Sequence, residues 1–208
     1  MRNPSLRTSL LLFTVAAFAE SVAHAENDVA ASLYGAFSGS TNGNGTAQSP
    51  SNAAGILLEL RHISNPLIGY EATYSYNRAN QTYTTTPVAC PVGLVPCSPE
   101  RQSVSADAHE ISADWIASVH VAHLRPFALA GVGVLINEPV GNQGSTQTQT
   151  KPAFIYGAGL DWNLVPHIGL RFQYRGNLYK APDLTTLFTS TGAFTHTAEP
   201  MIGAYFRF

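Results

Sequence analysis

The chain has 208 residues, a formal net charge of -2, and charged side chains at only 12% of its positions. Soluble domains carry about 25% charged residues, so this composition argues against a surface that mainly faces water. The small net charge and the lack of a Lys-rich or Arg-rich block argue against nucleic acid as a partner. The length suits one domain, and no shift in composition marks a second.

The N-terminal residues have the pattern of a cleaved export signal. Arg2 and Arg7 give a positive start, residues 9–19 form an apolar core, and an Ala-His-Ala sequence ends at Ala25. The core is too short for a membrane-spanning helix, which needs about 18 apolar residues. We therefore expect a signal peptide at residues 1–25 and a mature domain at residues 26–208.

The mature chain alternates between strand-like segments and polar connections. Each segment is about as long as the roughly 9 to 11 residues that a tilted strand needs to cross a bilayer. In chain order the eight predicted strands are Val29–Ser38, Gly55–His62, Leu67–Arg78, Asp107–Val119, Pro126–Asn137, Pro152–Trp162, Ile168–Tyr179 and Ala198–Phe208.

The connections alternate between long and short. Those after the first, third, fifth and seventh strands are long and polar, as at residues 41–46 and 144–150. Those after the second, fourth and sixth are tight, as at residues 63–66 and 163–167. Outer-membrane barrels have short periplasmic turns and long extracellular loops, with both termini on the periplasmic side. Loops this polar cannot bury enough apolar surface to fold alone, so we expect no independent structure in them.

Apolar and polar residues alternate within the strands. In the third strand Tyr70, Ala72 and Tyr74 share one face, and Glu71 and Thr73 share the other, as a period of two requires. We place the bulky apolar face toward lipid and the polar face toward the lumen; a soluble lipocalin-like barrel would have the opposite arrangement. The fifth strand is apolar on both faces, so its facing stays open. Aromatic residues expected at the membrane interfaces are Tyr70, Tyr76, Phe127, Trp162, Tyr179, Phe206 and Phe208.

The final strand ends the chain on an aromatic residue. Phe206 and Phe208 alternate with polar neighbours, as in the C-terminal signal for outer-membrane assembly. With the glycine-containing segments 131–134 and 157–162, this ending resembles the OmpA-like eight-stranded outer-membrane barrel family over residues 26–208. The resemblance implies an all-β, eight-stranded antiparallel transmembrane β-barrel. It also implies a monomer that contacts outer-membrane lipid, lipopolysaccharide and the barrel assembly machinery. The peptidoglycan-binding domain of larger family members is not carried over.

Charged residues fall on the face that we assign to the lumen. Both signs are present, and an eight-stranded barrel is just wide enough for side chains to fill it. Since burying single charges is expensive, we expect the charges to pair and to plug the lumen. The alternative is a narrow gated pore. The predicted interior cluster consists of Glu59, Arg61, Glu71, Glu110, Asp114, Asp161, Arg171, Arg175, Glu199 and Arg207.

One tripeptide suggests an enzyme. His62 and Ser64 are spaced as in lipid A deacylases, a class of outer-membrane barrel enzymes, and Asn65 follows them. A catalytic Ser, however, needs a His and a third group within hydrogen-bond reach, and the sequence offers no acidic partner. The tripeptide also falls at a predicted periplasmic turn, whereas lipid A lies in the outer leaflet. We therefore expect no catalytic residues, and lipid A modification remains the alternative.

Metal and cofactor sites are not expected. His120 and His123 lie in a predicted short turn without a third ligand, and Gly131-x-Gly133 lacks the later glycine of a dinucleotide loop. Cys90 and Cys97 predict a local disulfide in an exported chain, the alternative being a metal or redox pair. The expected role is structural in the envelope, or adhesion to a host or surface ligand through the loops.

Overall fold

The computed structural model describes residues 25–65, 67–85, 99–141 and 145–208. Residues 1–24 of the predicted signal peptide lie outside this part of the chain, as do Cys90 and Cys97 with their predicted disulfide. No helix among the described residues is long and apolar enough to cross a membrane.

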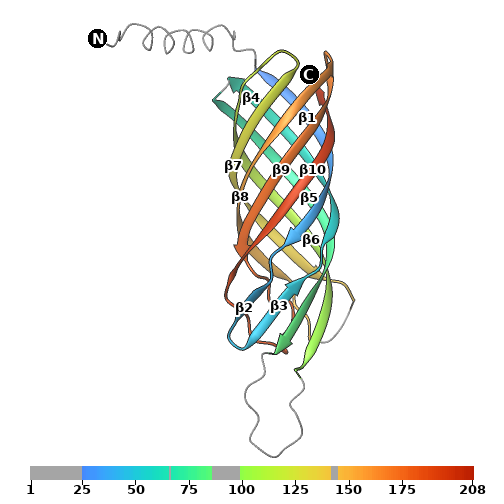
Figure 1. Ribbon diagram of the computed structural model, residues 1–208, viewed down its shortest axis with the longest axis vertical. Helices are drawn as coiled ribbons and strands as arrows, with labels where there is room; N and C mark the ends of the chain where they lie inside the picture. The colour runs from blue at the N-terminus through green and yellow to red at the C-terminus, as the bar shows by residue number, and fades with distance from the viewer. Residues whose placement is uncertain (1–24, 66, 86–98, 142–144) are drawn as a thin grey trace, which may run out of the picture.

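Eight long strands form a closed antiparallel barrel, which confirms the predicted fold class (Figure 1). Closure occurs where β1 pairs with both β10 and β4, while β5 and β6 pair across the remaining seam. The barrel strands are β1 (Glu26–Ser38), β4 (Ala53–Asn65), β5 (Ile68–Thr85), β6 (Arg101–Ser118), β7 (Leu124–Pro139), β8 (Gln149–Val165), β9 (Ile168–Lys180) and β10 (Phe194–Arg207).

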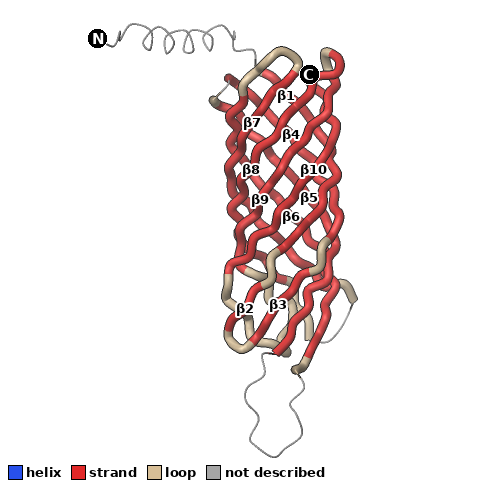
Figure 2. The backbone as a smooth tube through the Cα atoms, viewed as in Figure 1, coloured by secondary structure: helices blue, strands red, loops and turns tan. Residues whose placement is uncertain are grey.

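The two ends of the barrel differ. At one end lie the tight β4–β5, β6–β7 and β8–β9 turns together with the C-terminus, where the Phe208 N–H donates to the Asn27 carbonyl at 2.9 Å (Figure 2). At the other end lie the described parts of the longer connections, such as the β1–β4 and β9–β10 segments. This segregation matches the topology of outer-membrane barrels, in which short turns are periplasmic. We therefore name the two ends the periplasmic end and the extracellular end.

The barrel wall is polar inside and apolar outside. Along β5 burial alternates strictly from Ile68 to Ser75, with Tyr70 and Tyr74 exposed and Glu71 and Thr73 buried. A soluble barrel would show the reverse. The alternation also decides the facing of β7, where odd-numbered residues such as Leu129 point inward.

Two aromatic residues were placed wrongly by the sequence interpretation. Phe127, expected at the periplasmic interface, is buried in the lumen, because it follows the odd-numbered inward register of β7. Tyr179, expected at the outer interface, is also buried, and its hydroxyl lies 2.9 Å from Thr197 Oγ1. Trp162, Phe206 and Phe208 are exposed on the outer surface or rim.

The first long connection contains structure that the sequence interpretation did not expect. Strands β2 (Thr41–Gly43) and β3 (Thr46–Pro50) form a hairpin, and the two residues of its turn, Asn44 and Gly45, have positive φ angles. Asn-Gly favours this tight turn because both residues tolerate positive φ. The hairpin does not stand alone: β3 pairs with the end of β5, which continues beyond its predicted end at Arg78. Strand pairing thus supplies the stability that loop composition alone lacks.

Candidate functional site

Strand register brings opposite charges together in the lumen. Arg61 lies between Asp28 and Glu71 on the neighbouring strands, as the pairings of β4 with β1 and with β5 show. Asp161 on β8 likewise lies between Arg125 and Arg171. Directly opposed residues on one face of a sheet have Cβ atoms about 5 Å apart, so their charged groups meet. Acidic and basic residues thus face each other on neighbouring strands, and the ion network is made of these cross-strand pairs.

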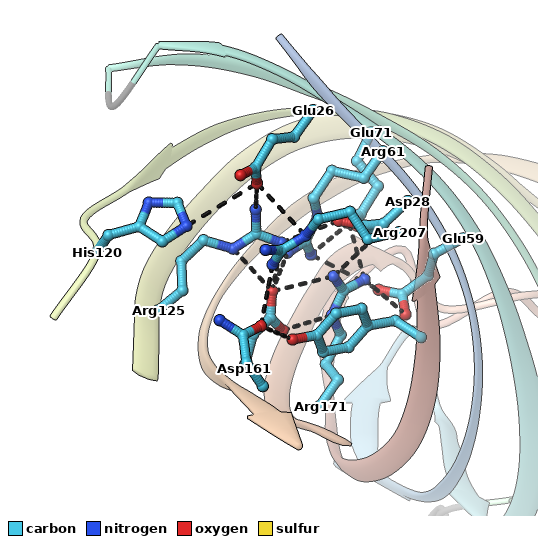
Figure 3. A network of polar contacts seen from close by, with 12 residues as sticks. Glu26, Asp28, Glu59, Arg61, Glu71, His120, Arg125, Asp161, Arg171 and Arg207 are labelled. Atoms are coloured by element: carbon cyan, nitrogen blue, oxygen red, sulfur yellow. Dashed lines mark hydrogen bonds and ion pairs between the residues drawn. The ribbon is translucent and has the colours of Figure 1, made fainter. Parts of the chain in front are cut away.

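Asp161 and Arg171 form the centre of this network (Figure 3). Arg171 Nε lies 2.7 Å from Asp161 Oδ1, and other nitrogens of its guanidinium lie 2.9 Å from Asp28 and 3.3 Å from Glu59. Arg61 Nε donates to Glu71 at 2.7 Å. These side chains are fully or almost fully buried, so each charge depends on its partners for solvation.

Arg125 is a lumen residue that the sequence interpretation missed. The predicted fifth strand starts at Pro126, which left Arg125 in the short turn before it, but β7 begins at Leu124 and the Arg125 side chain is fully buried. Its guanidinium contacts Asp161 at 2.7 Å and Asp28 at 2.9 Å. The available signal was spacing, since Arg125 stands two residues before the inward Phe127. The apolar character of both β7 faces hid that register.

A second ion-paired group lies farther along the lumen. Arg175 contacts Glu110 at 3.2 Å and Asp114 at 3.5 Å, and Asn177 donates to Glu110 at 2.8 Å. Arg175 also donates to the hydroxyl of Thr73 at 3.2 Å. Two predicted members lie at the edges of these groups: Glu26 links Arg207 to Arg125, which it contacts at 2.8 Å, and Glu199 borders the second group. Arg207 sits at the periplasmic rim, 3.5 Å from Glu26. Glu199 is buried opposite Arg175, and within the described part of the chain no cationic side chain lies within 4.0 Å of its carboxylate.

A cap that is held mainly by uncharged contacts covers the extracellular end. Residues 181–193, between β9 and β10, pack on the extensions of β5 and β6, where Tyr83, Val104, Ala106, Leu184 and Phe188 form an apolar cluster. The Tyr83 hydroxyl donates to the Pro182 carbonyl at 2.8 Å and accepts the Leu184 N–H at 3.0 Å. Burial raises the pKa of Tyr83 further above neutral pH, so the hydroxyl stays protonated even in alkaline solution.

The cap is also tied to the first-loop hairpin. Gln48 on β3 donates both to Gln81 and to the Pro182 carbonyl at 3.0 Å. At the hairpin tip the Asn44 amide donates to the Ser190 carbonyl at 2.8 Å. Loops distant in sequence therefore fold together into one polar platform, which the expectation of independent, unstructured loops did not foresee.

A small chamber lies between the ion network and the cap. Glu110, Asn137, Asn177, Tyr179 and Glu199 are among its lining residues, and its volume is about 30 Å³. A cavity needs about 10 to 15 Å³ for one water molecule, so the chamber accommodates water but not a solute. This favours a filled lumen over an open channel.

The remaining candidate residues lie at the periplasmic rim. The Ser64 hydroxyl is 3.0 Å from His62 Nε2 on the outer surface. His120 is partly exposed, and burial lowers its pKa although Glu26 opposes this shift. The rings of Phe206 and Phe208, the predicted assembly signal, stack at 6.4 Å between centroids. Among the described residues no group of three or more His, Cys, Asp or Glu side chains could hold a metal ion.

The chain is similar to known outer-membrane proteins in sequence family and in fold. The family model described as outer membrane protein beta-barrel domain matches residues 6–198. No curated protein matches the sequence. Neisserial surface protein A is similar in structure, with a TM-score of 0.57, 16% identity, and coverage of 88% of this chain and 97% of that one.

Two further solved structures have the same fold. OprG from Pseudomonas aeruginosa has a TM-score of 0.59 and 11% identity, covering 88% of this chain and 95% of that chain. Ail, the attachment invasion locus protein of Yersinia pestis, was solved in complex with the heparin analogue sucrose octasulfate. It has a TM-score of 0.52 and 16% identity, covering 89% of this chain and 99% of that chain. At these identities the likeness extends to the barrel fold alone.

Proposed function

Because the chain belongs to the outer membrane protein β-barrel domain family, we propose that this outer-membrane barrel anchors a folded extracellular platform for contact with a surface ligand. The observation that carries the proposal is the pairing of a filled lumen with an ordered cap. Arg171 and its partners occupy the periplasmic half, and the chamber above them holds only about 30 Å³. Lipid covers the outer face of the barrel wall, and ion pairs fill its inner face. The platform is therefore the part of the protein that is left to contact an external ligand.

The charge of the platform favours an uncharged, polar ligand. At the extracellular end, the connections and the strand ends next to them carry three acidic residues (Glu100, Glu138 and Asp183) and three basic ones (Arg101, Lys151 and Lys180), so these charges cancel. The sulfated sugar bound by Ail would need an excess of positive charge, which these connections lack. Ser, Thr, Asn and Gln dominate instead, and their amides and hydroxyls suit carbohydrate or protein hydroxyl groups.

The placement in the cell follows from the same proposal. Residues 1–25 would be removed as a signal peptide during export from a Gram-negative-type cytoplasm, leaving a barrel domain at residues 26–208. Phe206 and Phe208 would be read by the assembly machinery, and the mature monomer would contact lipopolysaccharide in the outer leaflet. Cys90 and Cys97 would form a disulfide in the connection between β5 and β6. No catalytic role belongs to this proposal.

Cell binding tests the platform. Cells that display the wild-type barrel should adhere to a panel of immobilised glycans and matrix proteins. A variant whose hairpin residues Asn42 and Ser49 and cap residue Thr186 are changed to Ala should lose adhesion yet stay folded. Equal adhesion by both variants, or no adhesion by the wild type, would contradict the proposal.

A structural role in the envelope is the second candidate, and the filled lumen favours it. Purified protein in planar bilayers should give no steady single-channel conductance. Stable conductance that disappears in Arg171→Ala or Arg175→Ala would replace both candidates with the narrow pore.

A further inference from the structure

Three polar side chains form a chain of hydrogen bonds on the outer surface at the periplasmic end. His62 Nε2 lies 3.0 Å from Ser64 Oγ, and His62 Nδ1 lies 2.8 Å from Asn27 Oδ1. In the tautomer with its proton on Nδ1, the ring donates to Asn27 and accepts from the Ser64 hydroxyl. A nucleophile, a base and a group that orients the base are the components of a hydrolytic triad.

Strand pairing supplies the orienting group that the sequence did not reveal. Asn27 on β1 lies directly opposite His62 on β4, although 35 residues separate them in the chain. All three side chains share the outward face, since Asn27 belongs to the odd-numbered face of β1 and His62 and Ser64 to the even-numbered face of β4. An amide oxygen fixes the ring as a carboxylate would, as the Cys-His-Asn variants of the triad demonstrate.

An apolar groove lies close to these residues, on the side of them that faces the middle of the membrane. Beyond Asn27 and His62 the same outward faces carry the opposed pair Val29 and Leu60, and then Ala31 and Leu58. Here the wall is hollowed into a groove of about 450 Å³, in which the small Ala31 and Ala204 lie among larger apolar side chains. Its lining residues are Val29, Ala30, Ala31, Leu58, Ile168, Ala204, Tyr205 and Phe206.

We propose that Ser64, His62 and Asn27 form an esterase site for glycerophospholipids of the periplasmic leaflet. An acyl chain would occupy the groove, and its ester would reach the polar trio, because the ester of a phospholipid lies where the hydrocarbon region meets the headgroups. Lipid A lies in the outer leaflet, out of reach of this periplasmic position, whereas glycerophospholipids of the periplasmic leaflet lie next to it. Tyr70, opposite His62 on β5 and on the same outward face, is the hydroxyl that we assign to the oxyanion.

The reaction consumes one water molecule. Ser64 Oγ bonds to the ester carbonyl carbon while His62 Nε2 takes its proton. The bond from that carbon to the glycerol oxygen then breaks, and the oxygen receives the proton, which gives a lysophospholipid and an acyl-Ser64. Water attacks the acyl carbon and passes a proton to His62, the bond to Ser64 breaks, and Ser64 Oγ regains the proton as the fatty acid leaves. Asn27 acts as a positioning residue throughout.

Fatty acid release tests the site directly. The full-length protein, refolded into vesicles of phosphatidylethanolamine and phosphatidylglycerol, should release fatty acid and lysophospholipid in equal amounts. Ser64→Ala and His62→Ala should reduce release to that of empty vesicles. Ser103→Ala and His123→Ala, which change exposed residues outside the trio, should keep the wild-type rate. Folding of every variant is checked by heat-modifiable gel migration.

A covalent probe gives a second measurement. A fluorophosphonate should label Ser64 in the wild-type protein and fail to label His62→Ala. Folded wild-type protein that neither hydrolyses lipid nor reacts with the probe would overturn the proposal, as would release that persists in Ser64→Ala.

Substitutions of Asn27 and Ala31 test two separate parts of the proposal: the positioning of His62 by Asn27, and the binding of an acyl chain in the groove. Asn27→Ala should lower the rate about tenfold or more, whereas Asn27→Asp, which keeps an oxygen acceptor, should restore it. Ala31→Trp should fill the groove and reduce hydrolysis of long-chain lipid, but leave hydrolysis of a short soluble ester unchanged. Equal rates for Asn27→Ala and Asn27→Asp would contradict the role of Asn27, and equal loss on both substrates in Ala31→Trp would contradict the groove.

Discussion

The periplasmic half of the lumen and the extracellular cap are both closed, but by different chemistry. In the periplasmic half, buried arginines such as Arg61 and Arg171 are surrounded by carboxylates (Figure 3). In the cap, the described contacts are uncharged, namely the hydrogen bonds of Gln48 and Tyr83 and the packing of Leu184. Removing one member of a buried ion pair leaves a charge without solvation, whereas truncating an apolar side chain leaves a cavity. The two regions should therefore respond differently to substitution.

The largest effect is expected for Arg171→Ala. This change leaves Asp28, Glu59 and Asp161 short of a buried partner, so the barrel should lose about 3 to 5 kcal/mol of unfolding free energy. Urea titration in detergent, followed by heat-modifiable migration, measures it. Arg78→Ala is the matched control, because Arg78 forms its ion pair with Asp107 on the exposed outer surface. Similar urea midpoints for Arg171→Ala and Arg78→Ala would show that the buried ion network contributes no more to stability than an exposed ion pair.

Leu184→Ala should have a smaller and local effect. Leu184 is fully buried in the cap, and its truncation should cost the cap about 2 to 4 kcal/mol. Hydrogen exchange should become faster in residues 181–188, while the urea midpoint of the barrel should stay near that of the wild type. A global shift like that of Arg171→Ala would mean that cap and barrel unfold together as one unit.

Tyr83→Phe separates hydrogen bonding from apolar packing within the cap. It removes one hydroxyl but keeps the ring, so the Leu184 N–H loses its acceptor and the Pro182 carbonyl one of its donors. The expected cost is about 1 to 3 kcal/mol, less than that of Leu184→Ala, because only hydrogen bonding is lost. Protease sensitivity of the cap measures it, and a larger loss than that of Leu184→Ala would refute this order.

His120 should give the smallest effect. Its pKa in the folded protein lies below the ordinary 6.5, so its stabilising contribution is present above pH 6.5 and is lost as pH falls through the folded pKa. The stability difference between wild type and His120→Gln should therefore shrink or reverse between pH 7 and pH 5. Parallel stability curves over that range would show that the burial of His120 does not affect folding.

Much of the barrel was predictable from local pattern. Alternation in β5 identified Glu71 as inward and Tyr70 as outward, because strand side chains alternate with a period of two. The same rule placed Arg61 and Arg171 inside before any contact was known. The rule gave no answer for β7, because both faces of that strand are apolar. As a result Arg125 was missed and Phe127 was placed on the wrong face.

The amino-acid sequence was enough to predict the eight barrel strands, the segregation of short and long connections, and most of the residues outside β7 that face the lumen or lipid. These depend on periodicity and turn chemistry within single segments. The three-dimensional structure was needed to show which charges meet, how residues 181–193 fold onto β3, β5 and β6, and that Asn27 reaches His62. The physical reason is register: contacts between strands and loops depend on how distant segments align, and that alignment is fixed only when the barrel closes.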